Sequence, residues 1–439
     1  MGATPTTTIR SRAIRRFPMT GHSPTPKPAR LRLGSGTPHM LVATFVSASA
    51  AFLYLVIVGR ALGPTDFAPI TVLWTLQYLV TTVVYVPVEL LTVRRLSQEN
   101  PEATPWALYV WVTAACTVGA LAFGFFTLDR FFAGDTGFLF VLGPLVVGYA
   151  GFAIGRGYLA GQRRFKEYAY AVSAESLLRL CAAGALLVAG VGTLGLSATM
   201  AAAPLVIWLW RPLRGRRRSE AGRPSEKGAA AALGAFISAT TASQTILAAG
   251  PLVVGGLGGS AAAVSVVGQT FLLLRAPLAV AYNMTSRVMP PLTRLVEAAQ
   301  WDRIRHLGMQ MGLGGLVTAA GGFGAGYLVG PALVALLMGP EYRPEPLLAA
   351  LAAAGTALAT VAAFAQQILV AMHSTGRLAV AWLCGLAAAA AVVVAAAGLG
   401  PSLRVGWAFL AGEGLAFVIL IGMVASAARP SLADEAPGA

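Results

Sequence analysis

The chain has 439 residues, of which 56% are hydrophobic and only 11% are charged. Soluble domains carry charge on about a quarter of their residues, so this composition excludes a water-soluble enzyme and requires lipid around most of the chain. The net charge of +15 could indicate nucleic-acid binding, but the positions of the basic residues argue for another explanation.

Residues 1–39 carry seven Lys or Arg among many Pro, Ser and Thr, and no acidic residue precedes Asp66. A segment of this composition cannot bury a core, so we predict a disordered basic tail. An arginine-rich, acid-free segment is also typical of transit peptides. The stretch PTPKPAR, however, interrupts any amphipathic helix there, and no cleavage site follows a short apolar core. We expect the first spanning helix to direct insertion into the membrane.

Twelve apolar segments of roughly twenty residues, the length that spans a bilayer, follow this tail. Their estimated bounds are 40–59, 68–92, 106–128, 138–160, 169–190, 193–210, 229–254, 261–282, 306–330, 346–371, 377–398 and 404–427. A basic linker over 211–228 separates two halves, 40–210 and 229–427, and 428–439 forms a second tail. The predicted fold class is an all-α polytopic membrane protein with about twelve transmembrane helices in two six-helix lobes, a plan common among secondary transporters.

The basic residues are distributed unequally between the two sides of these segments. The two tails and the loops after every second segment hold 26 of the 32 Lys and Arg. The opposite loops hold four, Arg60, Arg130, Arg343 and Arg404. Because cationic loops stay on the cytoplasmic side, both termini are predicted to be cytoplasmic. The net charge is thus explained by membrane topology and by attraction to anionic lipids, and we expect no nucleic-acid partner.

Ionisable residues inside spanning segments are costly, about 2.5–3.5 kcal/mol each on insertion scales, and are functional candidates by default. The predicted spans contain Glu89, Glu175, Arg179, Arg275 and Glu413, with Arg156 near a cytoplasmic helix end. Glu175 and Arg179 are four residues apart and share one helix face. They form either an internal ion pair or a site in which Arg179 binds an anionic headgroup and Glu175 adjusts its charge.

The other charges inside the membrane leave alternatives open. Arg275 has no obvious local partner, so it contacts either a substrate phosphate or the backbone carbonyls of a neighbouring helix. Glu89 lies within a turn of Arg94 and either extends to the interface or couples transport to protons. Glu413, between two glycines of the last segment, is a further candidate for proton coupling.

Several signals of enzymes are absent from the sequence. No phosphate-binding loop of the GxxxxGK type occurs, no His, Asp or Glu cluster has the spacing of a metal site, and no cofactor is expected. The three cysteines all lie in apolar segments, where we expect free, buried side chains and no disulfide. They are Cys116, Cys181 and Cys384.

Five stretches, in order along the chain, resemble the polysaccharide-export, or oligosaccharide flippase, branch of the multidrug/oligosaccharidyl-lipid/polysaccharide (MOP) exporter superfamily. They are VGRALGPTDFAPI, GRGYLAGQRRFKEYAYAVSAESLLRL, MPPLTRLVEAAQWDRIRHL, LLMGPEYRPEPLLAALAAAG and QQILVAMHSTGR. The resemblance covers roughly residues 41–427, although Ala68 replaces a glycine of the first pattern. It implies an inverted V of two six-helix lobes and alternating access. Lipid II flippases of this superfamily use cavity arginines for pyrophosphate, which makes Arg179, Arg275 and Arg156 the candidate substrate-binding residues.

The resemblance implies flipping or export of a lipid-linked, polyprenyl-pyrophosphate oligosaccharide across the cytoplasmic membrane for cell-surface polysaccharide synthesis. Glycosyltransferases or a polymerase are the expected protein partners. An inside-negative potential favours outward movement of anionic charge by about 2.3 kcal/mol per charge per 100 mV, so the membrane potential alone could drive export without ATP. The main alternative is an ion-coupled small-molecule exporter of the same superfamily or another secondary transporter. An enzyme of polysaccharide assembly is a third hypothesis, but the short external loops leave no room for a catalytic domain.

Overall fold

The computed structural model describes residues 37–97, 104–213, 226–372 and 374–427, and all its regular elements are helices. The predicted C-terminal tail and most of the predicted N-terminal tail and linker lie outside these residues, and the last three residues of the predicted N-terminal tail begin the first helix. The first half contains α1 (Thr37–Asp66), α2 (Ala68–Val80), the π-helix η1 (Thr81–Tyr85), α3 (Val86–Leu96), α4 (Trp106–Phe126), α5 (Leu128–Phe131), α6 (Gly137–Gly161), α7 (Phe165–Val188), α8 (Thr193–Ala202) and the 3₁₀ helix η2 (Ala203–Trp210). The second half contains α9 (Glu226–Ala248), α10 (Gly250–Gly256), α11 (Ala261–Leu274), α12 (Ala276–Glu297), α13 (Trp301–Leu328), α14 (Gly330–Met338), the 3₁₀ helix η3 (Pro340–Tyr342), α15 (Pro346–Ala371), α16 (Thr375–Ala395) and α17 (Pro401–Ala425).

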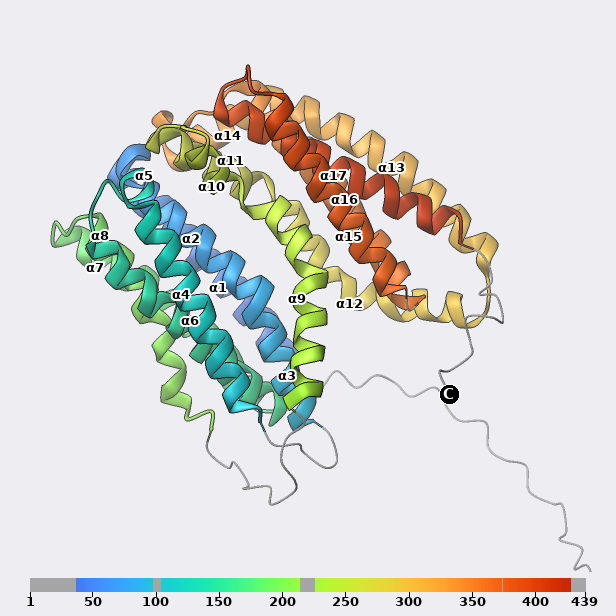
Figure 1. Ribbon diagram of the computed structural model, residues 1–439, viewed down its shortest axis with the longest axis horizontal. Helices are drawn as coiled ribbons and strands as arrows, with labels where there is room; N and C mark the ends of the chain where they lie inside the picture. The colour runs from blue at the N-terminus through green and yellow to red at the C-terminus, as the bar shows by residue number, and fades with distance from the viewer. Residues whose placement is uncertain (1–36, 98–103, 214–225, 373, 428–439) are drawn as a thin grey trace, which may run out of the picture.

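The helices form two groups that meet at one end of the molecule and separate toward the other (Figure 1). The closed end holds α5, α10, α11 and α14, and the wide end holds α3 and the turn between α12 and α13. Helix α9 runs between the groups, since it contacts α3 and η1 of the first half and α16 of the second. The described chain begins and ends at the wide end.

Nine described helices are long and apolar enough to cross a membrane, and a tenth span results if α13 and α14, which meet at 56°, are counted as one. The seventh and eighth predicted spans are present as broken helices. Helix α9 gives way to α10 just before Pro251, and α11 to α12 just before Pro277. Proline lacks the backbone donor of a continuous helix and favours the first turn of a new one. The fold class is therefore confirmed as an all-helical membrane protein, with two spans interrupted at prolines.

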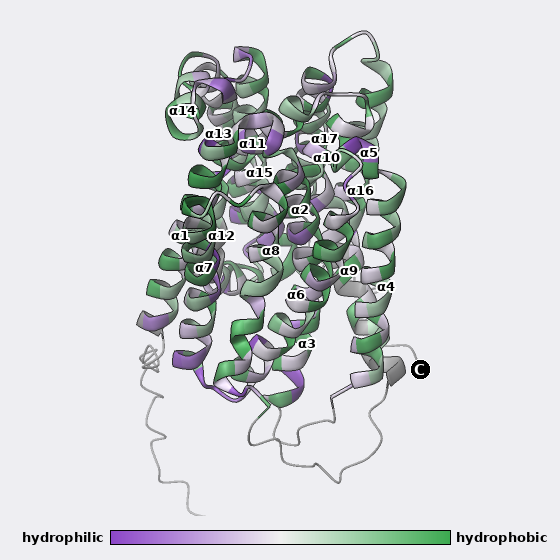
Figure 2. Cartoon of the chain, turned by 90° about the vertical axis from the view of Figure 1, so that its left-hand side faces the viewer, coloured by the Kyte–Doolittle hydropathy of each residue, from purple (hydrophilic) through white to green (hydrophobic). Residues whose placement is uncertain are grey.

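The surface of the helices suits a lipid environment. Hydrophobic residues cover most of the length of the bundle, and hydrophilic residues gather at its two ends and at a few internal positions (Figure 2). Large apolar side chains such as Phe126, Phe140 and Val188 are exposed. The chain is a multi-pass membrane protein. The three cysteines are free, as predicted, but none is fully buried. Cys181 is exposed on α7, and Cys116 and Cys384 are partly exposed, because their helices turn part of their surface outward, where lipid replaces protein packing.

Glycines allow close packing of helices in the second half, most clearly between α13 and α15. A Cβ atom added at Gly326 of α13 would lie 2.6 Å from the backbone oxygen of Ala349 and 2.9 Å from the Cα of Ala350. Backbone atoms of a packed helix cannot move aside as a flexible side chain can. Gly321, on the same helix, has no atom within 4 Å of such a Cβ.

We expect Gly326→Ala to lower the thermal stability of the detergent-solubilised protein, because overpacking costs about 1–3 kcal/mol. The matched variant Gly321→Ala should leave stability unchanged or raise it, since alanine is favoured over glycine in helices by about 0.5–1 kcal/mol. Thermal unfolding followed by the loss of monomer in size-exclusion chromatography compares the two variants. Equal melting temperatures would contradict the inferred backbone contact.

Candidate functional site

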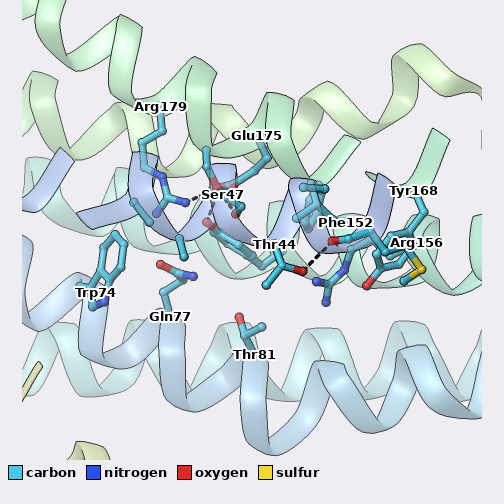
Figure 3. Close-up of a pocket in the computed structure, with 17 residues that line it drawn as sticks. Thr44, Ser47, Trp74, Gln77, Thr81, Phe152, Arg156, Tyr168, Glu175 and Arg179 are labelled. Carbon is cyan, nitrogen blue, oxygen red and sulfur yellow. Dashed lines mark hydrogen bonds and ion pairs between the residues drawn. The ribbon is translucent and has the colours of Figure 1, made fainter. Parts of the chain in front are cut away.

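A cavity of about 450 Å³ lies inside the first half, between α1, α2, η1, α6 and α7 (Figure 3). This volume is within the range of sites that bind small molecules. Its polar and charged lining comprises Thr44, Ser47, Gln77, Thr81, Tyr149, Arg156, Tyr168, Glu175, Ser176 and Arg179. The π-helical turn η1 precedes Pro87, which removes a backbone donor from the span, and it presents Thr81 to the cavity.

The predicted pair Glu175–Arg179 is present on α7, with 2.7 Å between Oε1 and Nη2. Both residues are at most 4% exposed. The Glu175 carboxylate also accepts hydrogen bonds from the Tyr149 hydroxyl of α6 at 2.7 Å and from the Ser176 hydroxyl at 2.9 Å. Its charge is therefore well compensated, as a buried carboxylate requires.

Arg179 keeps unused donors. Its guanidinium carbon lies 4.9 Å from the ring centroid of Trp74 and 5.7 Å from that of Tyr54, within cation–π range. Its Nε and Nη1 atoms are buried and have no hydrogen-bond partner among the described residues. Buried donors of a charged group are costly to leave unpaired. The guanidinium is thus positioned to bind acceptor oxygens that enter the cavity.

A second ion pair joins Arg156 of α6 to Glu89 of α3, with 2.5 Å between Nη2 and Oε2. The Tyr168 hydroxyl donates to the same carboxylate at 3.0 Å, and the Arg156 guanidinium lies 5.1 Å from the Phe152 ring centroid. Glu89 therefore pairs with Arg156 inside the helix bundle, whereas one of the two alternatives from the sequence was extension to the membrane interface. The Nε atom of Arg156 is buried without a hydrogen-bond partner in the described structure.

The two pairs make the cavity formally neutral while leaving guanidinium donors on both arginines. Hydroxyl groups of Ser47 and Ser176, 2.7 Å apart, and the side chains of Gln77 and Thr81 add neutral hydrogen-bonding groups (Figure 3). Guanidinium groups match the oxygen geometry of carboxylates and phosphates. The arrangement can bind an anionic, oxygen-rich group in competition with Glu175 and Glu89.

Arg275 lies elsewhere, at the junction of α11 and α12. Its Nη1 donates to the Leu247 carbonyl of α9 at 2.7 Å, its Nε donates to the Phe271 carbonyl at 3.1 Å, and its guanidinium carbon is 5.7 Å from the Tyr78 ring centroid. Of the two alternatives for this residue, the contact with neighbouring carbonyls is observed. A space of about 20 Å³, the size of a single water, lies beside it, and Trp74 lines both this space and the larger cavity.

Glu413 of α17 is 1% exposed, and its Oε2 has no hydrogen-bond partner among the described residues. Glu413 lies in α17 of the second half and does not line the cavity. No group of three His, Cys, Asp or Glu in the part of the chain that the structure describes is placed to hold a metal ion.

The structure thus brings together Arg156, Arg179, Glu175 and Glu89, and leaves Arg275 and Glu413 apart from them. Sequence reasoning missed Trp74, Tyr149 and Ser176 as parts of the site. An aromatic or small polar residue inside an apolar segment carries no signal of its own, because only the packing of α2 and α6 against α7 decides which of them face the arginines.

Solved structures of low sequence identity share this fold. An inward-facing multidrug resistance MATE family transporter of the MOP superfamily superposes with a TM-score of 0.68 at 11% identity, covering 86% of this chain and 93% of the other. The lipid II flippase MurJ in an inward closed conformation gives 0.66 at 12% identity, covering 88% and 87%. A MOP superfamily transporter from Pyrococcus furiosus, described as having a binding pocket of reverse polarity, gives 0.55 at 13% identity, covering 89% and 96%.

No protein-family profile matches the sequence, and no curated protein matches it. At these identities the structural likeness establishes the fold, which is that of MATE transporters and MurJ with about twelve transmembrane helices. Its solved neighbours are transporters and flippases.

Proposed function

We propose that this chain is a MOP-type transporter that flips or exports a lipid-linked oligosaccharide bearing a polyprenyl pyrophosphate, for the synthesis of cell-surface polysaccharide. The observation that carries the proposal is Arg179, which lines the cavity and has two buried donor nitrogens without a hydrogen-bond partner among the described residues. The charged headgroup enters the polar cavity while the lipid tail stays in the bilayer, since neither a sugar nor a phosphate can cross hydrocarbon unaided.

The proposed orientation places the wide end of the helix bundle and both termini in the cytoplasm of the cell, in its cytoplasmic membrane. Two observations support it. Basic residues lie at helix ends on this side: Arg94 in the last turn of α3, Arg163 between α6 and α7, and Arg303 in the first turn of α13. The fold also superposes better on an inward-facing MATE transporter, at a TM-score of 0.68, than on an outward-facing one, at 0.54.

Ion-coupled export of a small molecule is the second candidate function. The buried carboxylates of Glu89, Glu175 and Glu413 support it, because protonation of such groups can drive exchange. Paired arginines in the cavity disfavour a cationic cargo, so this candidate predicts a neutral or anionic substrate.

Depletion of the protein from its cells tests the first candidate against the second. We expect a lipid-linked sugar to accumulate on the cytoplasmic face of the membrane, measured by mass spectrometry of extracted lipids and by a membrane-impermeant label that reports sidedness. Depleted cells in which a plasmid copy restores the protein provide the control. An unchanged lipid-sugar pool, with a changed efflux of small molecules, would overturn the flippase proposal. Co-purification of a glycosyltransferase or polymerase tests the proposed partners.

A further inference from the structure

Arg60, at the end of α1, reaches from the first half of the protein to the second. Its Nε donates to the carbonyl oxygen of Leu337 at 2.8 Å, and its Nη2 donates to that of Leu336, both in the last turn of α14. A further hydrogen bond runs from the second half to the first, because the Tyr342 hydroxyl donates to the Gly59 carbonyl at 3.0 Å. These bonds hold α1 against α14 and η3 at the closed end of the molecule (Figure 1).

Arg130, on α5, makes a similar contact at the same end. Its Nε donates to the Gly255 carbonyl at 2.5 Å, in the last turn of α10. Beside it, Phe131 packs so closely on Gly255 that a Cβ atom there would lie 1.9 Å from the phenyl ring. Only glycine therefore permits this approach of α5 to α10.

The two contacts share one design. Each arginine belongs to the first half, and each acceptor lies in the last turn of a short helix of the second half. The Gly255 carbonyl also accepts from the Gly258 N–H at 3.0 Å, so Arg130 shares this acceptor with the turn after α10. Neither arginine is paired with a carboxylate among the described residues, and both residues are exposed. A guanidinium released from such a contact regains hydration at once, so the bonds can break and reform readily.

These arginines are also exceptions in the sequence, because only four of the 32 basic residues fall in the loops on this side of the membrane. A third exception, Arg404, also donates to a backbone carbonyl, that of Val393 at 3.1 Å, but this bond stays inside the second half between α17 and α16. Three of the four basic residues on this side therefore bind backbone carbonyls, and two of these contacts cross between the halves.

We propose that Arg60 and Arg130 form a latch that keeps this end closed, and that both contacts break whenever the protein opens there to release its cargo. The latch rests on the proposed alternating-access function. It holds the two halves through charged donors and neutral carbonyls, so its strength does not depend on the titration of an acidic partner.

Distance measurement between two spin labels tests the latch. The labels are placed in a variant without native cysteines, at Thr136→Cys before α6 and Glu345→Cys before α15, two exposed positions in the two halves at this end. In lipid nanodiscs without substrate, Arg60→Ala and Arg130→Ala are each expected to raise the ratio of long to short distances by about three- to tenfold, and the double variant by more.

Arg404→Ala is the matched control, because it removes an arginine and a carbonyl contact on the same side without touching the other half. Its distance distribution should equal that of the unsubstituted protein. A double variant with unchanged distances, or an equal shift in the control, would overturn the latch. If the double alanine variant fails to fold, Arg60→Lys combined with Arg130→Lys should shift the ratio in the same direction by less.

The measurement requires no substrate, so it separates the latch from the cargo assignment. Opening in the latch variants together with an unchanged lipid-sugar pool on depletion would sustain the latch and reject the proposed cargo. Unchanged distances with an accumulating lipid-linked sugar would reject the latch and sustain the proposed cargo.

Discussion

Replacing Arg179 by alanine is expected to reduce export of the lipid-linked substrate by about 100-fold or more. Arg179 lines the cavity, and two of its donors have no hydrogen-bond partner among the described residues. Hydrogen bonds to charged groups are worth about 1.5–3 kcal/mol each, so losing both removes the main attraction for a phosphate. The measurement is the sidedness of the lipid-linked sugar in depleted cells that express the variant. The Arg179→Lys variant should remain impaired, because an ammonium cannot keep the Glu175 bond and also present a planar pair of donors.

The matched control for this prediction is Arg303→Ala. Arg303 is an exposed arginine of α13 whose contact is with the nearby Gln300, so export should be unchanged although the same charge is lost. Arg156→Ala is expected to impair export as Arg179→Ala does. Full export by both cavity variants, at normal protein levels, would remove the cavity from consideration as the substrate site.

Helix positions were largely predictable from the sequence, because a run of twenty apolar residues has only one stable form in a bilayer. The helix breaks before Pro251 and Pro277 were harder to predict from the sequence. A proline inside a span can also be accommodated without ending the helix, as Pro144 is within α6. Whether a helix bends or ends depends on neighbouring helices, which a hydropathy pattern does not describe.

One of the two ion pairs could be predicted from the local sequence, and the other could not. Glu175 and Arg179 are four residues apart on one helix, so their pairing follows from helical geometry. Glu89 and Arg156 lie on α3 and α6, and nothing in either local sequence indicates that these helices pack together. Arg275 was equally ambiguous, since its carbonyl acceptor on Leu247 is exposed only where α9 ends before α10.

At the closed end of the molecule, the sequence indicates the hydrogen-bond donors but not their acceptors. Arg60 and Arg130 could be singled out in the sequence as basic residues on the sparsely charged side. Their acceptors, however, are backbone carbonyls of α14 and α10. Every residue has such a carbonyl, so no side-chain pattern marks the partner. Sequence reasoning can therefore identify the unusual donor but not the contact that explains it.

A double-mutant cycle on Glu175 and Arg179 is expected to show a large effect on stability. Glu175→Leu leaves a buried guanidinium with ring contacts only, and removing one partner of a buried ion pair costs about 3–5 kcal/mol. The double variant with Arg179→Met removes both charges, and we expect it to recover most of that loss, because apolar replacements of buried pairs are often neutral. Arg179→Met alone should be milder than Glu175→Leu, because the hydroxyls of Tyr149 and Ser176 still donate to the carboxylate.

The same helix provides the control for the cycle. Glu167 of α7 pairs with Arg164 three residues earlier, but both side chains are partly exposed, so Glu167→Leu should cost no more than about 1 kcal/mol. Unfolding in detergent, followed by tryptophan fluorescence against denaturant, measures all four variants. Additive effects of the Glu175 and Arg179 substitutions would mean that the two side chains do not stabilise each other. A large coupling with intact expression of the double variant would identify the pair as one charge-balanced unit, whose disruption by an entering anion must be compensated by the bonds that the anion makes.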